Sequence, residues 1–464
     1  MGLWRTSSRK SHASTKSHRS QKSETNIESL NNHESQQNAT ADYNDPAASA
    51  AQAAGTAWLA GHLNHLTPEQ EEKLAEFKRV CEERGYYKPG KPGSEGEGEK
   101  PSHDDATLLR FLRARKFDVN AAFQQFKDTE DWRRDNAIEA LYENIDVDSY
   151  EEARRVYPQW TGRRDRRGIP VYVYVIKHLN SKNMAAYSSK VSSTTTAETH
   201  KSSKVPPRLL RLFALYENLL RFVMPLCSAL PRPNPETPVV TSTNIVDVSG
   251  VGLKQFWNLK GHMQDASVLA TAHYPETLDR IFIIGAPSFF PTVWGWIKRW
   301  FDPVTTSKIF ILSPSEVLPT LTAFMDPSSI PKQYGGELDW EWGDMPNLDE
   351  PARQLAGGLE IPPKPGEKKP GFVKGPVLFK GDHIEVLGTE GGKNRRMNIP
   401  VPVQKTGQES AASEKAGDSS AGADADAAKD GEPKSEPAQN QNENENKKAA
   451  LEQSNGTAVS AQPA

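Results

Sequence analysis

The stretch LLRFLRARKFDV, at residues 108–119, places four cationic side chains among leucines and phenylalanines. They are Arg110, Arg113, Arg115 and Lys116. Guanidinium and ammonium groups donate charge-assisted hydrogen bonds to phosphates, so the stretch predicts a helix that binds an anion. The candidate partners are nucleic acid, a membrane surface and a phosphorylated small molecule. The alternative is a solvated helix face without a partner.

No pattern of catalytic or metal-binding residues accompanies these cations. The sequence has no Gly-x-Ser-x-Gly nucleophile elbow, and its eleven histidines show no His-Glu-x-x-His spacing. Gly250 and Gly252 follow a strand-like segment, but Gln255 stands where a dinucleotide-binding turn needs its third glycine. We therefore expect neither an enzyme nor a metal site or cofactor. The net charge of −3 argues against nucleic acid as the partner.

A second unusual stretch, SFFPTVWGWIKRWFDPVTTSK, begins at Ser288 and is apolar nearly all round. Tryptophan flanked by cations is typical of a segment at a membrane interface, whereas the alternative is a helix buried in the core. A helix that covers an apolar cavity and meets lipid when it opens would satisfy both interpretations. The residues that we expect to contact membrane are Phe289, Phe290, Trp294, Trp296, Ile297, Trp300 and Phe301.

Capping residues predict the elements that hold the basic stretch. LTPEQ, at residues 66–70, predicts a helix start with a capping box and a proline in the first turn. Ser102 and Asp105 predict a second capping box, and Asp118 predicts the cap of a third helix. Three or four short helices therefore precede any strand.

From residue 168 onward, strand-like and helical segments alternate. Segments rich in β-branched and aromatic residues predict strands at residues 168–177, 239–248, 280–287 and 308–312. Helical periodicity falls at residues 209–230, 253–274 and 314–325, and the Ser/Thr/Lys-rich residues 181–204 predict a loop. This alternation predicts the α/β class, with a mostly parallel sheet under helical cover and a small all-α domain in front.

The longest apolar segment, residues 209–230, is long enough to span a bilayer. Arg211, Glu217 and Arg221 interrupt it, so we interpret it as a buried helix of a protein that is not integral to a membrane. Cys81 and Cys227 form no disulfide framework and no metal-ligand spacing, which fits a reducing compartment.

Composition separates folded from polar parts of the chain. The last aromatic residue is Phe379, and beyond Gln408 eleven acidic and five basic residues dominate, so this part cannot bury enough apolar surface to fold. We place the end of the main folded part at Trp342. The predicted parts are a disordered tail (1–57), a helical domain (58–150), an α/β domain (151–342), an extension in which VLFKGDHIEVLG predicts a short hairpin (343–403) and a second disordered tail (404–464).

The N-terminus, MGLWRT, matches the pattern for N-myristoylation with Gly2 as the acceptor. Six basic residues and no acidic residue precede Glu24, and a basic patch is the usual second signal beside one acyl chain. The alternatives are a mitochondrial transit peptide and a basic tail without an acyl group.

Four segments together resemble the CRAL-TRIO lipid-binding family: LLRFLRARKFDV, HYPETLDRIFIIGAP, FDPVTTSKIFIL and IPKQYGGEL. Within that family the chain is most similar to the fungal secretory phosphatidylinositol/phosphatidylcholine transfer proteins, from about Leu66 to Leu338. The resemblance implies a helical N-terminal domain and an α/β domain that encloses one phospholipid under a mobile gate helix. The aromatic stretch from Ser288 to Phe301 would be this gate.

The resemblance also implies headgroup-binding residues. Ser242 matches a serine of the family's choline-lipid site, whereas Asn244 and Ala270 stand where the family carries hydroxyl groups. We expect Arg110 and Arg113 to be solvated or bonded within the helical domain. The residues that match the inositol-phosphate site are Arg115, Lys116, Glu276, Thr305 and Lys308.

We therefore expect a monomeric, cytoplasmic lipid transfer protein that associates peripherally with Golgi, endosomal or other membranes. Its ligand would be phosphatidylinositol, with phosphatidylcholine as a candidate second lipid and no other cofactor. One alternative is a lipid-responsive scaffold that binds phosphoinositide without bulk transfer. Another is a sterol or small-hydrophobe carrier of the same fold, which would not need Lys308.

Overall fold

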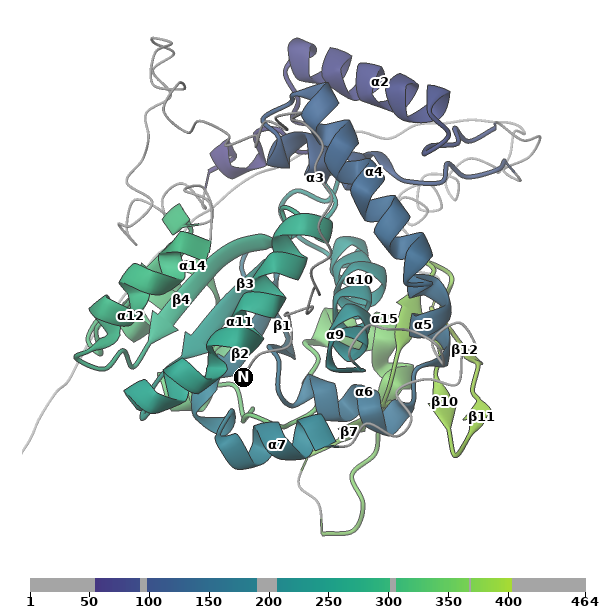
Figure 1. The fold of residues 1–464 in the computed structure, drawn as a ribbon. Helices are drawn as coiled ribbons and strands as arrows, with labels where there is room; N and C mark the ends of the chain where they lie inside the picture. The colour runs from purple at the N-terminus through teal and green to yellow at the C-terminus, as the bar shows by residue number, and fades with distance from the viewer. Residues whose placement is uncertain (1–54, 92–97, 190–206, 301–305, 367–368, 403–464) are drawn as a thin grey trace, which may run out of the picture. The chain divides into compact units, whose positions relative to one another are not determined.

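The structure is a computed structural model that describes residues 55–91, 98–189, 207–300, 306–366 and 369–402 (Figure 1). The predicted tail 404–464, and all of tail 1–57 except its last three residues, lie outside the described residues. Gly2 also lies outside them. The disorder of the tails and the acylation of Gly2 therefore stay predictions.

Short helices form the N-terminal part of the fold. Three of them pack around Phe126, whose ring meets those of Phe77 and Phe111 with centroids 5.8 and 5.1 Å apart. The described residues of this part form a 3-10 turn and five helices: η2 (Ala57–Leu59), α2 (Pro68–Glu83), α3 (Asp105–Ala114), α4 (Val119–Asp135), α5 (Ile138–Asn144) and α6 (Val147–Arg154).

Two of the three predicted helix starts are confirmed. Thr67 and Gln70 form the capping box of α2, and the Asp118 carboxylate accepts from the Ala121 amide at the start of α4. The capping box predicted from Ser102 and Asp105 is wrong. Asp104 caps α3 instead, because the Ser102 hydroxyl already accepts from the Lys88 amide at 3.0 Å.

A five-stranded sheet in the order β1-β2-β3-β4-β5 follows. The strands β2 to β5 are parallel. The strands β2, β3 and β5 fall within predicted strand segments, and β4 overlaps its predicted segment but begins two residues earlier. The strands are β1 (Gln159–Arg164), β2 (Pro170–Val175), β3 (Ser242–Asp247), β4 (Leu278–Ile284) and β5 (Ile309–Ile311).

The strand β1 was not predicted, and it pairs antiparallel with β2. Its sequence, QWTGRR, contains Trp160 as the only strongly apolar residue, so it carries no alternating pattern. Pairing with β2 and burial beneath the C-terminal part of the chain make it a strand. Trp160 is only 7% exposed.

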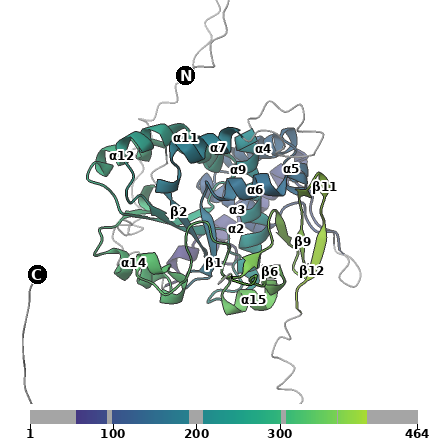
Figure 2. The same ribbon diagram turned by 90° about the horizontal axis from the view of Figure 1, so that it is seen from below.

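Helices cover both faces of the sheet. Figure 2 shows α11 (Leu253–His273) and α12 (Phe290–Ile297) on one side and α14 (Val317–Phe324) on the other. The 3-10 turn η6 (Lys298–Trp300) continues from α12. The predicted α/β architecture, with a mostly parallel sheet and helical cover, is confirmed.

The connection from β2 to β3 differs from the prediction. Residues 181–204 were expected to be a loop, but Ser181–Ser189 form the helix α7. The Asn180 carboxamide accepts from the Asn183 amide at 3.0 Å at its start, and buried Tyr187 anchors it with its ring against Tyr157. Residues 190–204 lie outside the described residues.

The long apolar segment forms α9 (Pro207–Asn218), a π-helical turn η5 (Leu219–Val223) and α10 (Met224–Ala229). Within the described part of the chain, Arg208–Ala229 is the one helix that is long and apolar enough to cross a membrane. More than half of it is buried, and Leu212 and Phe213 belong to the core, which agrees with a core helix.

Ordered structure continues well beyond Trp342, where the sequence placed the end of the main folded part. Helix α15 (Glu350–Ala356) is followed by the antiparallel strands β8 (Val377–Phe379) and β9 (His383–Val386), at the residues of the predicted hairpin. The further short elements are η7 (Pro327–Ser329), η8 (Lys332–Tyr334), η9 (Gly357–Leu359), β6 (Glu360–Ile361), β7 (Gly371–Phe372), β10 (Thr389–Glu390), β11 (Lys393–Asn394) and β12 (Met397–Pro400).

Candidate functional site

The two faces of the sheet serve different purposes because side chains alternate along each strand. One cross-strand row packs under α14 in a closed hydrophobic cluster: Val173, Ile245, Phe282 and Phe310. The neighbouring row points to the other face and lines a cavity: Tyr172, Asn244, Ile281 and Ile309.

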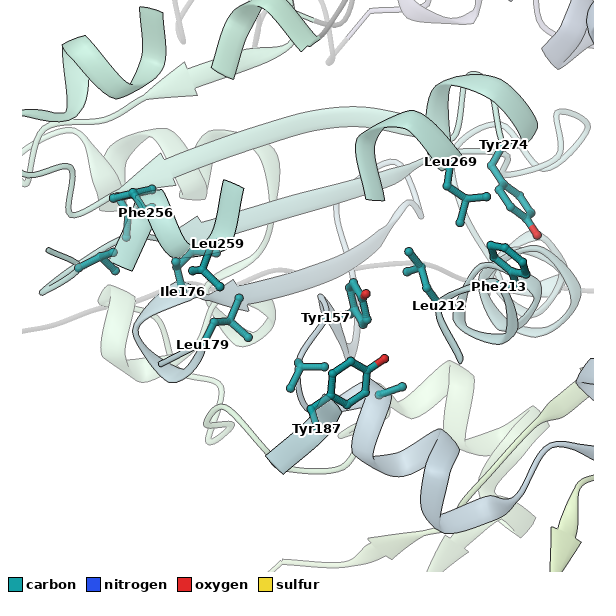
Figure 3. Packing of buried hydrophobic residues seen from close by; sticks show 14 of the residues in the cluster. Tyr157, Ile176, Leu179, Tyr187, Leu212, Phe213, Phe256, Leu259, Leu269 and Tyr274 are labelled. Atoms are coloured by element: carbon teal, nitrogen blue, oxygen red, sulfur yellow. The ribbon is translucent and has the colours of Figure 1, made fainter. Parts of the chain in front are cut away.

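This cavity of about 310 Å³ lies between the sheet and the helices α9, α11 and α12. Most of its lining is aliphatic or aromatic, with a few polar groups from Ser242, Asn244, His262, Ser267 and Thr277. Figure 3 shows the surrounding cluster, with Phe256 and Leu259 near one end of the strands, Tyr157 and Tyr187 in the middle and Leu269 and Tyr274 near the other end. An apolar cavity with few polar groups suits a hydrophobic ligand.

The helix α12 closes one side of the cavity. Phe290 is 2% exposed, and both Phe290 and Trp294 line the cavity, whereas Trp296 faces outward and is 43% exposed. The rings of Phe289 and Phe290 lie against Phe256 of α11 with centroids 6.1 and 6.0 Å apart. The aromatic stretch thus covers an apolar cavity and also presents an aromatic side chain outward. Membrane contact by these residues stays a prediction.

Three of the expected gate residues lie partly or wholly beyond what the structure describes. Phe301 is outside the described residues, as is Thr305 of the predicted headgroup site. For Ile297 and Trp300 the backbone is described but the side chains are not.

A partly buried charge cluster lies where α3 meets the turn between α11 and β4. The Arg113 guanidinium donates to Glu276 Oε2 at 2.9 Å, and Lys308 Nζ lies 3.7 Å from the same oxygen. Lys308 also donates to the carbonyl of Leu278, which lines the cavity. Burial lowers the pKa of Arg113, and the carboxylate of Glu276 opposes this shift. The cluster therefore sits beside one end of the cavity.

Backbone strain accompanies this cluster. Lys116, Phe117 and Glu276 have φ values of 50°, 62° and 57°, in the left-handed region that side chains other than glycine rarely adopt. Such residues are retained where surrounding structure holds them, and they gather at binding sites. Two of the three segments that carry predicted headgroup residues are strained in this way.

The structure places the predicted inositol-phosphate residues in two groups. Glu276 and Lys308, 32 positions apart in sequence, are brought together. Arg115 and Lys116 are exposed at the end of α3, where Arg115 donates to the neighbouring carbonyl of Ala114 at 3.4 Å. A role for these four residues in binding a headgroup stays a prediction.

The expectation that Arg110 and Arg113 remain within the helical domain is wrong. Arg110 donates to the carbonyl of Pro275 at 3.2 Å, and Arg113 binds Glu276, so both reach the α/β part of the chain. Burial lowers the pKa of Arg110 to about 10. The spacing of three placed both on one helix face, but nothing in the spacing indicated which surface that face would meet.

Ser242, which the resemblance matches to a second headgroup site, begins β3 at the wall of the cavity. Its role in binding a headgroup stays a prediction. Its hydroxyl donates to the carbonyl of Thr277 at 3.2 Å and accepts from the Asn244 carboxamide at 3.1 Å. Ser267 of α11 also lines the cavity and was not predicted. Ser267 lies four residues after Met263 and three before Ala270, which also line the cavity. This helical spacing could have predicted that Ser267 lies on the same face of α11.

His262 also lines the cavity. Its ring stacks on Tyr157 with centroids 4.6 Å apart, and the Tyr157 hydroxyl lies 3.4 Å from His262 Nδ1. Burial lowers the pKa of His262. Within the described parts of the chain, no group of three His, Cys, Asp or Glu side chains is arranged to hold a metal ion.

Comparison with known proteins agrees with this geometry. Residues 73–128 match the family described as "CRAL/TRIO, N-terminal domain", and residues 154–336 match the "CRAL/TRIO domain". The first range spans α3 with parts of α2 and α4, and the second spans the five-stranded sheet with its covering helices.

Several fungal and plant proteins are similar to this chain. The SEC14 cytosolic factor of Kluyveromyces lactis is 32% identical over 63% of this chain and 86% of its own length. The SEC14 cytosolic factor of Yarrowia lipolytica is 33% identical, and the match covers 70% of this chain and 60% of that protein. The phosphatidylinositol/phosphatidylcholine transfer protein SFH7 of Arabidopsis thaliana is 33% identical over 51% of this chain and 40% of its own length. The chain belongs to the CRAL/TRIO family, as a lipid-binding protein and not an enzyme.

Proposed function

We propose that this CRAL/TRIO protein binds phosphatidylinositol and exchanges it at cytosolic membrane surfaces. The observation that carries the proposal is an apolar cavity with a cluster of two cations and one carboxylate beside one end. The name of the Arabidopsis relative, a phosphatidylinositol/phosphatidylcholine transfer protein, supports a phospholipid as the ligand. Golgi and endosomal membranes are the proposed sites of action.

The two parts of the site match the two parts of a phospholipid. The apolar lining takes the acyl chains, whose burial contributes about 0.8 kcal/mol per methylene group and offsets their removal from the bilayer. Lys308 and Arg113 provide charge for the phosphate, with Arg115 and Lys116 as exposed cations at the neighbouring helix end. A phosphate taken from water needs such partners, because an uncompensated charge in an apolar site is costly.

Glu276 suits the inositol ring. Both of its cationic neighbours contact Oε2, at 2.9 Å from Arg113 and 3.7 Å from Lys308. Oε1 can therefore accept a hydrogen bond from an inositol hydroxyl while the carboxylate stays paired. A sterol or a choline headgroup offers fewer hydroxyl donors to this carboxylate, so the cluster favours inositol lipids.

The lid of the proposed mechanism is α12. Phe290 and Trp294 close the cavity, and ring contacts connect α12 to α11. We expect the helix to leave this position at a membrane surface, where its inner aromatic side chains meet lipid instead of the cavity. One phospholipid then leaves and another enters.

Native mass spectrometry of the purified chain, followed by a vesicle-to-vesicle transfer assay, tests the proposal. We expect a co-purified phosphatidylinositol and loss of its transfer in Lys116→Ala/Lys308→Ala, with an unchanged circular-dichroism melt. A co-purified sterol, or unchanged phosphatidylinositol transfer in the variant, would contradict the proposed ligand or the proposed site. Static lipid binding without transfer would favour the scaffold alternative.

A further inference from the structure

The outer face of α11 carries large apolar side chains that have no part in the proposed opening of α12. Leu253, Trp257 and Val268 are 48%, 62% and 61% exposed. Their spacings of four and eleven residues place all three on one side of the helix, opposite the residues that line the cavity. An exposed apolar stripe of this kind indicates a surface that meets an apolar partner.

The stripe continues onto α12. The rings of Trp257 and Trp296 meet edge to face with centroids 5.9 Å apart, and Trp296 is itself 43% exposed. Between the two helices lies a surface groove of about 350 Å³. Its lining includes both tryptophans, Phe256 and Val293, and its charged members are Lys260 and Arg299.

The charge around this groove has one sign. The exposed charged residues of α11, α12 and η6 are Lys254, Lys260, Lys298 and Arg299. Their one carboxylate, Asp265, is half-buried and accepts from Arg208 at 2.9 Å, so it is already neutralised. The Lys260 ammonium lies over the Trp257 ring, 5.5 Å from its centroid, at the edge of the groove.

We propose that the groove between α11 and α12 binds the phosphate of an anionic phospholipid that remains in the bilayer. Tryptophan rings settle at the headgroup level of a membrane, and Lys260 and Arg299 lie beside them at the depth of the lipid phosphates. The charge complementarity selects an anionic bilayer as the partner. The inference rests on the proposed function and adds α11 to the membrane-contacting surface, beside a lipid-phosphate site distinct from the cavity.

Such a site would hold the protein with α12 against the membrane while the cavity exchanges its lipid. Since the phosphate-binding cations flank the lid, anionic lipid would favour the orientation in which the lid faces the bilayer. The charge-dependent part of binding should weaken with added salt, because salt screens exposed charges.

Flotation of the full-length protein with vesicles tests the proposal. The vesicles are phosphatidylcholine alone and phosphatidylcholine mixed with phosphatidylserine, and the variants are Lys260→Gln/Arg299→Gln and Trp257→Ala. We expect the charge variant to bind mixed vesicles about 25-fold more weakly, since each basic residue near an anionic surface contributes about fivefold, and to bind neutral vesicles normally. Trp257→Ala should weaken binding to both kinds of vesicle.

The matched control is Lys88→Gln/Lys393→Gln, which removes two exposed charges from the helical domain and the C-terminal extension. It should bind mixed vesicles within about twofold of the unmodified protein, since its charges lie away from the proposed contact. The proposal is overturned if the groove variant keeps its preference for anionic vesicles, or if the control loses binding equally. Mass spectrometry of the co-purified lipid tests the cavity separately, so an empty cavity would contradict the proposed function and leave the groove result interpretable.

Discussion

Two walls of the cavity are held in different ways. On the α9 side, Glu217 is 1% exposed and accepts two hydrogen bonds from Arg133, at 2.7 and 3.1 Å, and one from the Tyr274 hydroxyl at 2.9 Å. Next to it, Asn218 donates to the Tyr142 hydroxyl, which in turn bonds to the backbone of Val377. Buried polar bonds thus tie α9 to the helical domain and to the C-terminal extension.

On the opposite side of the cavity, α12 is held by apolar contacts. Among the described residues, the interactions found between α11 and α12 are ring contacts, from Phe256 to Phe289 and Phe290 and from Trp257 to Trp296. Helix α11 itself is tied to other elements by polar bonds along its length. The Gln255 carboxamide donates to the carbonyl of Ile176 at 3.0 Å, the Asp265 carboxylate accepts from Arg208 at 2.9 Å, and the Gln125 carboxamide donates to the carbonyls of Thr271 and Ala272.

The difference indicates which wall can open. Separating ring contacts against lipid costs little, because no buried donor or acceptor is left without a partner. Separating the Arg133–Glu217 wall would leave buried charges unpaired. The fold therefore directs motion to α12, away from α9.

The strongest test of the fixed wall is Glu217→Ala. It leaves the Arg133 guanidinium without its buried partner, and we expect the free energy of unfolding to fall by about 3–5 kcal/mol. Urea denaturation measures the change. The paired variant Arg133→Met/Glu217→Leu removes both charges and should cost clearly less; a loss below about 1 kcal/mol in Glu217→Ala would show that the pair does not hold this wall.

Tyr142→Phe tests the tie to the C-terminal extension. The hydroxyl donates to the Val377 carbonyl at 2.7 Å and accepts from the Val377 amide and the Asn218 carboxamide, both at 3.1 Å. We expect a loss of about 1–3 kcal/mol in unfolding and faster proteolysis within the extension. Tyr187→Phe, which removes a hydroxyl that donates to the backbone carbonyl of Arg208, should leave proteolysis of the extension unchanged.

Two phenylalanines of the same hydrophobic cluster compare the walls directly. Phe213 on α9 and Phe290 on α12 are 4% and 2% exposed. Phe213→Ala should cost about 3–5 kcal/mol in global unfolding. Phe290→Ala should cost only about 1 kcal/mol and instead raise amide hydrogen exchange within α12, because the lid opens locally. Equal global losses would show that the two walls are equally fixed.

The smallest expected effect concerns the C-terminal end of α11. The His273 ring stacks on Trp132 with centroids 4.1 Å apart, and burial lowers the pKa of His273 to about 4. The unfolded chain therefore binds this proton more readily, so the contribution to stability is complete above about pH 6.5 and is lost as the pH falls toward 4. His273→Gln should make the urea midpoint less dependent on pH over this interval; an unchanged dependence would show that other groups cause it.

Much of the fold could be predicted because it depends on local patterns. The capping residues of α2 and α4 act within one helical turn, and the apolar segments of β2 to β5 are continuous enough to be recognised alone. The strand β1 escaped prediction because QWTGRR has no such pattern. Most of the ordered structure in the C-terminal extension was not predicted, because its short elements are stabilised by distant partners such as Tyr142.

The sequence by itself determined the family, the α/β class and the residue types that suit a phospholipid: a basic helix, the carboxylate at Glu276, Lys308 and an aromatic stretch. Only the tertiary structure decided which cation meets which anion. Arg113 and Glu276 are 163 positions apart. Arg113, and not the more exposed Arg115, binds Glu276 because the packing of α3 turns the Arg113 side chain inward. Helical spacing defines a face, but the partner of that face is set by long-range packing, which no local pattern records.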